Sequence, residues 1–312
     1  LLDNAGVERI HGRGRLVGER TVEVNGVRLK SSHVVIACGG VPHRPNNIVG
    51  TDLALSSDDL FTLATLPKRL VIVGGGYIAT EFASIFAGFG SEVHLIVRGE
   101  NVLRGFDADI AQHVQEALSA RGVRVRTSCQ LARITETSNG ARNVTLDDGT
   151  ELVVDEVVLA TGRRPNTSGL GLAALGAKQT ETGGVPVDEN YRTNLPWLYA
   201  LGDVTERLQL TPVALAEGTY LAHHLFGTPR PPVPYPLVPT AVFTNPPVAT
   251  VGLTEAQARA ECGAVVIYRS RFRPLANTIA GRDERTLMKL IVDAQTDRVL
   301  GAHMVGPDAP EI

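Results

Sequence analysis

The sequence contains only three cysteines in 312 residues, and they are far apart. Cys38, Cys129 and Cys262 form no CxxC or comparable pair, so the sequence contains neither a zinc motif nor a local redox pair, and we predict no metal site. Such a sparse, odd count argues against a secreted disulfide framework and favours a reducing compartment, so we expect a cytoplasmic protein. We interpret all three thiols as small buried apolar side chains.

Several other features are absent, and each absence excludes a class of protein. The formal net charge is only −3, so no basic field would attract nucleic acid. No apolar run approaches the roughly 20 residues that span a bilayer, so we predict no membrane partner. The chain begins at Leu1 without a starter Met or a signal peptide, and it stops at Ile312 without a helix-ending signal. We therefore expect a piece cut at both ends, although its length still suffices for two or three cores.

The hydrophobic pattern changes along the chain. Residues 1–66 are mostly β in character, and Asn25-Gly26 is a hairpin signal between the strands Thr21–Val24 and Val27–Lys30. Residues 67–166 instead alternate strand and helix. This alternation predicts parallel βαβ units.

The second half of the chain has a different organisation. Strands return from 185 to 203, and a helix follows from about Pro212 to Phe226. A proline-rich stretch over residues 228–239 is a stiff connector and the clearest boundary. Beyond it, Thr254 and Gln257 have the spacing of a capping box, which predicts the start of a helix.

A nucleotide-binding motif follows the buried strand 69–73. This strand runs into Gly74-Gly75-Gly76-Tyr77-Ile78-Ala79, which is GxGxxA at the start of a helix. Gly74 permits a tight turn, Gly76 lets the backbone approach a pyrophosphate, and Ala79 lets the helix pack closely on the strand. The alternative is a merely structural glycine turn.

The helix after these glycines has an apolar stripe. Its apolar residues share one face, as expected of an amphipathic helix: Ile78, Phe82, Ile85, Phe86 and Phe89. Gly90 would end the helix, and residues 92–97 would form the second strand. Strand, glycines, amphipathic helix and strand within about thirty residues predict a dinucleotide site.

Arginines after the second strand favour NADPH over NADH. An NAD site has an acidic residue near the end of this strand, whereas an NADP site has arginine. Arg98 and Arg104 can hold a 2′-phosphate through charge-assisted, bidentate bonds, although Glu100 lies nearby. The alternative is a pair of solvated surface arginines.

These motifs resemble a known family. The segments that carry the resemblance are Gly74–Glu81, the pair Arg98 and Arg104, Ala160–Thr167 and Thr193–Asp203. They resemble the class I pyridine nucleotide-disulfide oxidoreductases, the group of glutathione, trypanothione and mercuric reductases and dihydrolipoamide dehydrogenase. The resemblance covers essentially the whole chain. The segments that look most like plant and bacterial NADPH-dependent glutathione reductases are Val238–Thr254, Phe272–Thr278, Met288–Asp293 and Gly301–Asp308.

The resemblance implies a fold class and an order of domains. The implied fold is α/β, with FAD/NAD(P)-binding three-layer (ββα) Rossmann-like domains plus the start of an α+β dimerisation domain. The implied domains are residues 1–66 (part of the FAD domain), 67–184 (the NADPH domain, with a β meander that turns at Asp147–Gly149), 185–235 (the returning FAD segment) and 236–312 (a truncated dimerisation domain).

The family also implies FAD, and four residues would contact it. These are Gly39, Gly202, Asp203 and Thr211. Asp203 ends a strand and would accept from the ribityl chain. The helix that begins at Thr211-Pro212 would stabilise negative charge on a reduced flavin. The alternative for Asp203 is a surface residue that caps a helix.

NADPH is the second implied cofactor. Its implied contacts are Gly74, Gly75, Gly76, Ile78, Ala79, Glu81, Arg98, Arg104, Gly162 and Arg163. Tyr77 would cover the flavin until nicotinamide displaces it, and Glu81 would pair with a lysine that this chain lacks. Tyr77 could instead be a helix-entry aromatic, Glu81 a helix-surface acid and Arg163 a solvated loop residue.

The sequence also departs from the family pattern. Cys38 replaces a threonine in the first ATGG-like turn, and Thr219 stands where several glutathione reductases have an arginine that contacts glutathione. The reactive CxxxxC disulfide and the catalytic His-Glu pair would lie outside residues 1–312, so neither is assigned within the chain. His223 and His224 are interpreted as ordinary helix residues.

The implied activity is the reduction of glutathione disulfide by NADPH in thiol redox homeostasis, carried out by a homodimer. Hydride would pass to flavin N5, electrons would pass to a cysteine disulfide, and a thiolate would attack glutathione disulfide. The alternatives are a mercuric, trypanothione or dihydrolipoamide-type member, or a non-catalytic nucleotide-binding flavoprotein that lacks CxxxxC. Residues 1–312 alone should not reduce glutathione disulfide.

Overall fold

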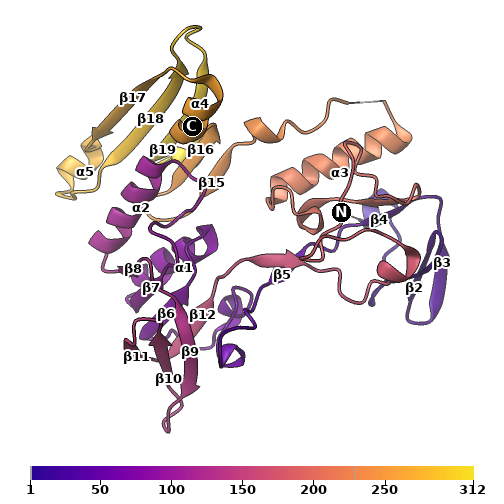
Figure 1. The fold of residues 1–312 in the computed structure, drawn as a ribbon, viewed down its shortest axis with the longest axis horizontal. Coiled ribbons are helices and arrows are strands. Elements are labelled where there is room, and N and C mark those ends of the chain that lie inside the picture. Colours follow the sequence, from indigo (N-terminus) through magenta and orange to yellow (C-terminus); the bar gives the residue numbers. More distant parts are fainter. Residues whose placement is uncertain (1, 229) are drawn as a thin grey trace. The chain divides into compact units, whose positions relative to one another are not determined.

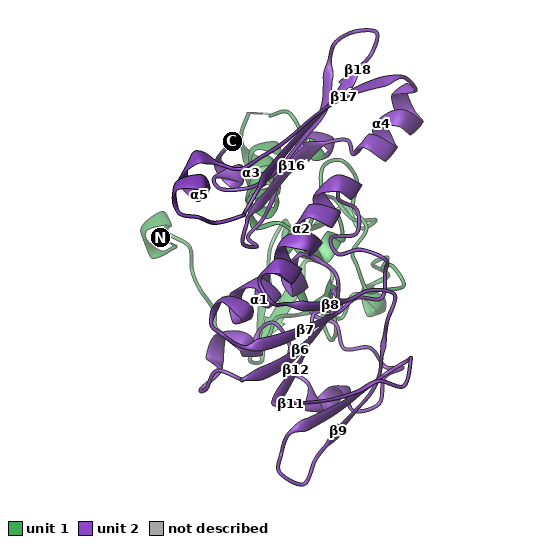
Figure 2. Cartoon of the chain, turned by 90° about the vertical axis from the view of Figure 1, so that its left-hand side faces the viewer, with its two compact units in different colours: residues 1–41, 163–235 green, residues 42–162, 236–312 purple. Residues whose placement is uncertain are grey.

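The computed structural model describes residues 2–228 and 230–312. Pro229, in the predicted proline-rich connector, lies outside the described residues. The chain forms two compact units, coloured separately in Figure 2: residues 1–41 with 163–235, and residues 42–162 with 236–312. Each unit therefore combines two stretches that are distant in sequence. The domain boundaries derived from the sequence stay a prediction.

The first unit contains three small sheets and one long helix. A three-stranded antiparallel sheet has the order β1-β2-β3, β4 pairs in parallel with β14, and β5 pairs with β13. The strands are β1 (Arg15–Gly18), β2 (Thr21–Val24), β3 (Val27–Lys30), β4 (Val34–Ile36), β5 (Gly40–Pro42), β13 (Arg163–Pro165) and β14 (Leu198–Ala200), and the helix is α3 (Thr211–Phe226). The predicted hairpin is confirmed, because Asn25 and Gly26 both have positive φ and join β2 to β3.

The second unit contains the strands and helices of the predicted βαβ units (Figure 1). A parallel sheet has the strand order β12-β6-β7-β8. Its elements are β6 (Arg69–Val73), α1 (Tyr77–Gly88), β7 (Glu92–Ile96), α2 (Ala108–Ala120), β8 (Arg124–Arg126) and β12 (Glu156–Leu159). Leu70, Val71 and Ile72 are completely buried, as expected for a central strand that is covered on both faces. The predicted βαβ units and the α/β fold class are confirmed.

Two antiparallel sheets complete the second unit. The meander consists of β9 (Leu131–Glu136), β10 (Arg142–Leu146) and β11 (Glu151–Val154). A five-stranded sheet has the order β15-β16-β19-β18-β17. Its elements are β15 (Thr240–Val242), β16 (Val248–Gly252), α4 (Glu255–Cys262), β17 (Val265–Phe272), α5 (Leu275–Ile279), β18 (Thr286–Asp293) and β19 (Val299–Val305). The capping box at the start of α4 is confirmed, because Thr254 and Gln257 exchange side-chain and backbone hydrogen bonds.

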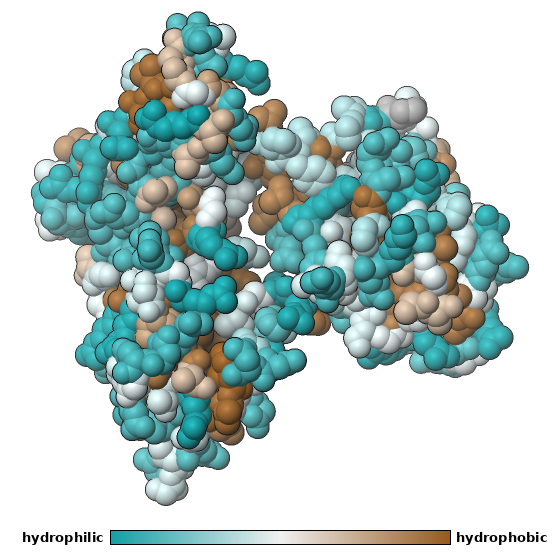
Figure 3. Space-filling model, in the orientation of Figure 1, coloured by the Kyte–Doolittle hydropathy of each residue, from teal (hydrophilic) through white to brown (hydrophobic). Residues whose placement is uncertain are grey.

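One hydrophobic core joins this five-stranded sheet to the parallel sheet. Val242, Val248, Leu287 and Val305 belong to the same buried cluster as side chains of β6, α1, β7 and α2. Short 3-10 turns occur at η1 (Asp3–Ala5), η2 (Thr51–Leu53), η3 (Asp59–Thr62), η4 (Ala173–Leu175), η5 (Gly202–Thr205), η6 (Tyr235–Leu237) and η7 (Ala309–Glu311). Among the described residues, no helix combines the length and the apolar character needed to span a membrane. Figure 3 shows a mostly hydrophilic face with scattered apolar patches.

Only part of the predicted apolar face of α1 is buried. Ile85 and Phe89 are 42% and 67% exposed, whereas Ala79, Ala83 and Phe86 form the buried stripe. The small alanines let the helix approach the sheet closely, and this approach rotates the larger side chains at 85 and 89 away from it. The contact with the sheet is therefore made by the small residues rather than by the largest ones.

The prediction that all three thiols are buried is also wrong for two of them. Cys129 is buried, Cys38 is half-buried, and Cys262 is exposed at the end of α4, a short helix in which only Ala258 is buried. Burial, together with the neighbouring Asp147 carboxylate, raises the pKa of the Cys129 thiol to about 11. The Cys129 thiol is therefore a protonated core side chain at neutral pH.

Two phenylalanines, one in α1 and one at its C-cap, test this packing. Phe86→Ala should lower the free energy of unfolding by about 3–5 kcal/mol, because it leaves a cavity in the core. Phe89→Ala, the matched control three residues later, should lower it by no more than about 0.5 kcal/mol. Urea unfolding followed by circular dichroism measures both, and equal losses would contradict the observed orientation of the helix.

Candidate functional site

The turn after β6 is too tight for side chains. A Cβ on Gly74, whose φ is +142°, would lie 2.2 Å from the Ala160 carbonyl oxygen. A Cβ on Gly75 would lie 2.6 Å from Cγ1 of Val97. Ala79 is fully buried beneath this turn. The three small residues therefore allow α1 to begin directly at the carboxyl end of β6.

Gly76 faces open space at the start of α1. No atom lies within 4 Å of the position that its Cβ would occupy. Gly76 is the N-cap, no side chain caps the helix there, and the first turn of this twelve-residue helix contains no acidic residue. The N–H groups of the first turn, the positive end of the helix dipole and a missing side chain fit a pyrophosphate. Tyr77 and Ile78, the first residues of α1, are half-buried beside this position.

The two arginines lie on a loop that is attached to the glycine turn. Arg98 lies two residues after the end of β7. The loop that carries Arg104 is fixed by a hydrogen bond of 2.6 Å from the Leu103 N–H to the Gly75 carbonyl. Both arginines are exposed, and neither guanidinium forms a hydrogen bond or ion pair with another described residue. Glu100 is exposed as well and is not paired with either of them. Two unpaired guanidiniums beside a pyrophosphate cradle fit a 2′-phosphate.

Glu81 has a partner within its own unit. Its Oε1 accepts a hydrogen bond of 2.8 Å from the backbone N–H of Phe243, just after β15. Burial raises the pKa of the Glu81 carboxyl, and the Phe243 N–H partly offsets this effect. Glu81 therefore attaches α1 to the segment that carries the five-stranded sheet. Its predicted role, like that of Tyr77, stays a prediction.

Gly162 and Arg163 fall on either side of the boundary between the two units. Gly162 has φ +114°, and its carbonyl accepts from the His43 N–H over 2.9 Å. The guanidinium of Arg163 donates to the Gly40 carbonyl within the first unit. Their assignment to NADPH stays a prediction.

The candidate flavin residues lie at the carboxyl ends of two paired parallel strands. Gly39 follows β4, and Gly202 and Asp203 follow β14. Gly39 and Gly202 have φ of +65° and +70°, which allow the backbone to turn sharply at this edge. The half-buried Asp203 carboxylate forms no hydrogen bond or ion pair with another described residue. An acceptor at a strand end fits the hydroxyl groups of a flavin side chain.

The helix α3 begins at Thr211 beside this sheet. Pro212 occupies its first turn, no acidic residue lies there, and no side chain caps it. The free N–H groups of this sixteen-residue helix fit negative charge on a flavin or its phosphates. Thr219, further along the helix, is exposed and donates to the Leu215 carbonyl. Cys38, beside Gly39, donates to the Asn166 carbonyl over 3.1 Å.

Glu217 was not predicted as a site residue from the sequence. This carboxylate is completely buried, its Oε2 accepts from the Gly202 N–H over 2.6 Å, and its Oε1 accepts from the Tyr235 hydroxyl over 2.5 Å. Arg207 also donates to the Tyr235 hydroxyl, over 3.1 Å. Glu217 thus holds the turn that presents Asp203. The sequence pattern could have indicated a buried partner for this carboxylate, because Glu217 interrupts the apolar stripe formed by the buried Val213 and Leu221.

Comparison with known proteins gives a consistent result over the whole chain. The family model described as pyridine nucleotide-disulphide oxidoreductase matches residues 1–218, and the dimerisation domain of the same family matches residues 238–312. Glutathione reductase of Burkholderia cepacia is 45% identical over 312 residues, and that of Nostoc sp. is 43% identical over 325 aligned positions. The chain is covered completely and spans 69% and 71% of these relatives. The chloroplastic/mitochondrial glutathione reductase of Pisum sativum is 44% identical, and the chain spans 56% of it.

Solved structures show the same architecture. The HOCl-induced flavoprotein disulfide reductase RclA from Escherichia coli superposes with a TM-score of 0.92 at 30% identity, and the match covers all of this chain and 72% of RclA. A Cu(II) complex of the same protein superposes with a TM-score of 0.90.

Glu217 provides a test of the flavin assignment. Glu217→Ala should weaken FAD binding about tenfold, because the Gly202 N–H loses its buried acceptor and the turn beside Asp203 relaxes. Glu217→Gln keeps an acceptor and should retain FAD. Val213→Ala, on the same buried stripe, should reduce stability without reducing flavin content. Titration of the apoprotein with FAD measures all three, and full affinity in Glu217→Ala would contradict the assignment.

Proposed function

The chain belongs to the pyridine nucleotide-disulphide oxidoreductase family, and from this premise we propose that its protein reduces glutathione disulfide with NADPH. The family consists of flavin-dependent oxidoreductases that use a pyridine nucleotide, and its glutathione reductase members use FAD and NADPH, so a flavoprotein disulfide reductase is the general activity. The observation that supports glutathione as the substrate is the continuous match to glutathione reductases from two bacteria and a plant, at 43–45% identity. A homodimer is proposed from the dimerisation domain at residues 238–312.

Residues of the second unit would bind and orient NADPH. The Gly76 turn and the N-terminus of α1 would bind the pyrophosphate through N–H groups, because no side chain blocks the approach. Arg98 and Arg104 would hold the 2′-phosphate. Together they would fix the adenosine half of the cofactor, so that the nicotinamide end reaches one defined place. Gly162 and Arg163 are proposed as further contacts.

Residues of the first unit would bind FAD. Asp203 would accept from a flavin hydroxyl, Gly39 and Gly202 would let the backbone come close, and Thr211 would direct the N–H groups of α3 toward negative charge. Bound FAD supplies the chemistry that links a hydride donor to a disulfide. In this chain, Gly39 and Gly202 would leave room for the flavin beside the backbone, and Asp203 would provide the hydrogen-bond acceptor.

A second disulfide reductase activity is the alternative. RclA shares the fold at 30% identity, and its description names HOCl induction rather than glutathione. Thr219 stands where several glutathione reductases have an arginine that contacts glutathione, so this position does not favour glutathione over another disulfide. A direct comparison of substrates distinguishes the two activities.

The FAD-loaded holoenzyme should oxidise NADPH with glutathione disulfide faster than with any other acceptor in a panel. The panel contains lipoamide, trypanothione disulfide, mercuric ion and cupric ion, each at matched concentrations, with NADPH absorbance as the measurement. Turnover with glutathione disulfide at least about tenfold above the others supports the proposal. Turnover with only a metal ion would overturn it while leaving the family assignment intact.

The two arginines should determine the choice of cofactor. The holoenzyme should prefer NADPH to NADH by at least about tenfold in kcat/KM, about 1.4 kcal/mol. Arg98→Met with Arg104→Met should remove most of this preference by weakening NADPH alone. Arg282→Met, at an exposed arginine outside the site, is the control and should retain it. Equal use of both cofactors by the unmodified enzyme would show that the assignment is wrong.

A further inference from the structure

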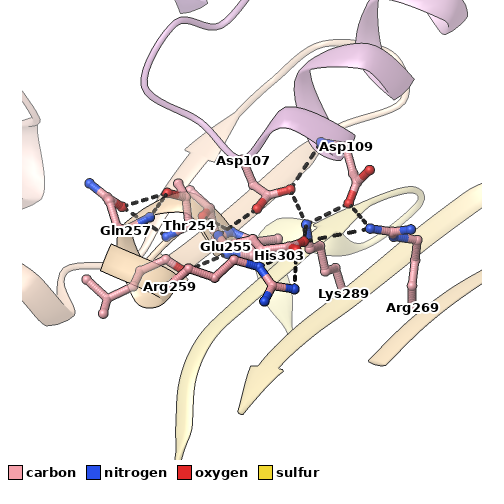
Figure 4. Close-up of polar contacts among 11 residues, drawn as sticks. Asp107, Asp109, Thr254, Glu255, Gln257, Arg259, Arg269, Lys289 and His303 are labelled. Atoms are coloured by element: carbon pink, nitrogen blue, oxygen red, sulfur yellow. Dashed lines mark hydrogen bonds and ion pairs between the residues drawn. The ribbon is translucent and has the colours of Figure 1, made fainter. Parts of the chain in front are cut away.

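A buried lysine joins the five-stranded sheet of the second unit to the start of helix α2. Lys289, on β18, is 2% exposed, and its Nζ lies 2.8 Å from Asp107, 2.6 Å from Asp109 and 2.8 Å from Glu255 (Figure 4). Asp107 and Asp109 lie at the start of α2, whereas Glu255 lies at the start of α4. A single ammonium therefore connects the helix that follows the arginine loop to the five-stranded sheet.

Asp107 is the most constrained member of this cluster. Its carboxylate accepts from the Asp109 N–H, from the Glu255 N–H over 3.0 Å and from Lys289. Burial alone would raise the pKa of Asp107, but the Glu255 N–H and the Lys289 ammonium outweigh this effect and hold it below its usual value. Asp107 is therefore a buried anion in a fixed position at the N-cap of α2.

The loop that carries Arg104 is fixed at both ends. On one side of Arg104, the Leu103 N–H donates to the Gly75 carbonyl in the glycine turn. On the other side, three residues further along, Asp107 is held by Lys289. Leu103 is buried with a positive φ of 53°, and its carbonyl accepts from the Phe106 N–H over 3.0 Å, so Arg104 lies within a closed turn. Displacement of Asp107 would change the direction in which Arg104 leaves the backbone.

We propose that Lys289 is a positioning residue for recognition of the 2′-phosphate: through Asp107 it fixes the loop that presents Arg104. The inference rests on the proposed role of Arg98 and Arg104 in NADPH binding. It extends that role to the five-stranded sheet, which contains no residue of the nucleotide site itself. A purely structural ion cluster would instead affect all nucleotides equally.

Two variants separate these possibilities. Lys289→Met removes the ammonium, and Asp107→Ser cuts the link to Lys289 while it keeps a good N-cap for α2. In the holoenzyme, each should weaken binding of adenosine 2′,5′-bisphosphate about tenfold. Binding of 5′-AMP, which lacks the 2′-phosphate, should change by less than about twofold, because the glycine turn is intact. Isothermal titration calorimetry measures both ligands, and Asp107→Ser provides the answer if Lys289→Met does not fold.

Arg271→Met is the matched control. Arg271 also connects β17 of the same sheet to α2, through Glu116 at 2.9 Å, but it does not touch Asp107. It should leave the affinity for both ligands unchanged. Equal weakening of both ligands in Lys289→Met and Asp107→Ser, or no weakening of either, would overturn the inference.

The double variant Arg98→Met with Arg104→Met distinguishes failure of the inference from failure of the proposed function. If this variant loses affinity for adenosine 2′,5′-bisphosphate and the Lys289 and Asp107 variants do not, only the inference is wrong. If the arginine variant binds that ligand normally, the assignment of the 2′-phosphate site itself is wrong.

Discussion

The close approach of backbone at the end of β6 constrains the whole nucleotide-binding region. Gly74 donates to the Ile96 carbonyl of β7, and Ala160, just after β12, donates to the Val73 carbonyl, so the turn lies between two neighbouring parallel strands. No Cβ fits beside the Ala160 carbonyl, and the chain must leave β6 through glycine. The direction of α1, the position of the N–H groups at its start and the attachment of the arginine loop to Gly75 all follow from this one restriction.

Local features of the fold could be predicted from the sequence because their causes are local. The strand, glycine turn and helix at 69–88, the hairpin at Asn25-Gly26 and the capping box at Thr254 each depend on residues within a few positions of one another. The orientation of α1 could not be predicted in the same way. Periodicity identified an apolar stripe, but the part that contacts the sheet depends on how closely the helix can approach, which Ala79 and Ala83 determine.

The partners of the residues that support the candidate sites could not be predicted from the sequence, because these partners are distant along the chain. Lys289 and Asp107 are 182 positions apart, and Glu217 bonds to Gly202 across 15 positions and to Tyr235 across 18. Lys289 and Glu217 each interrupt an apolar pattern. Lys289 lies between the buried Leu287 and Ile291, and Glu217 lies between two buried apolar residues of α3. A polar residue in such a place signals a buried partner. Only the fold identifies which partner it is.

The energetics of the Lys289 cluster explain why it should fix geometry rather than supply stability. Removing an ammonium and a carboxylate from water costs several kcal/mol per ion, and apolar replacements of buried ion pairs are often equally stable. The contacts among Val248, Leu287, Val305 and the apolar side of α2 already provide hydrophobic stabilisation where the two sheets share a core. Such apolar contacts are not directional, so they tolerate small shifts of α2 relative to the five-stranded sheet. Hydrogen bonds from one ammonium to three carboxylates are directional, and they allow a single register between α2 and β18. The apolar core therefore holds the two parts of the second unit together, and the ion cluster determines where the first turn of α2, and with it the arginine loop, is placed.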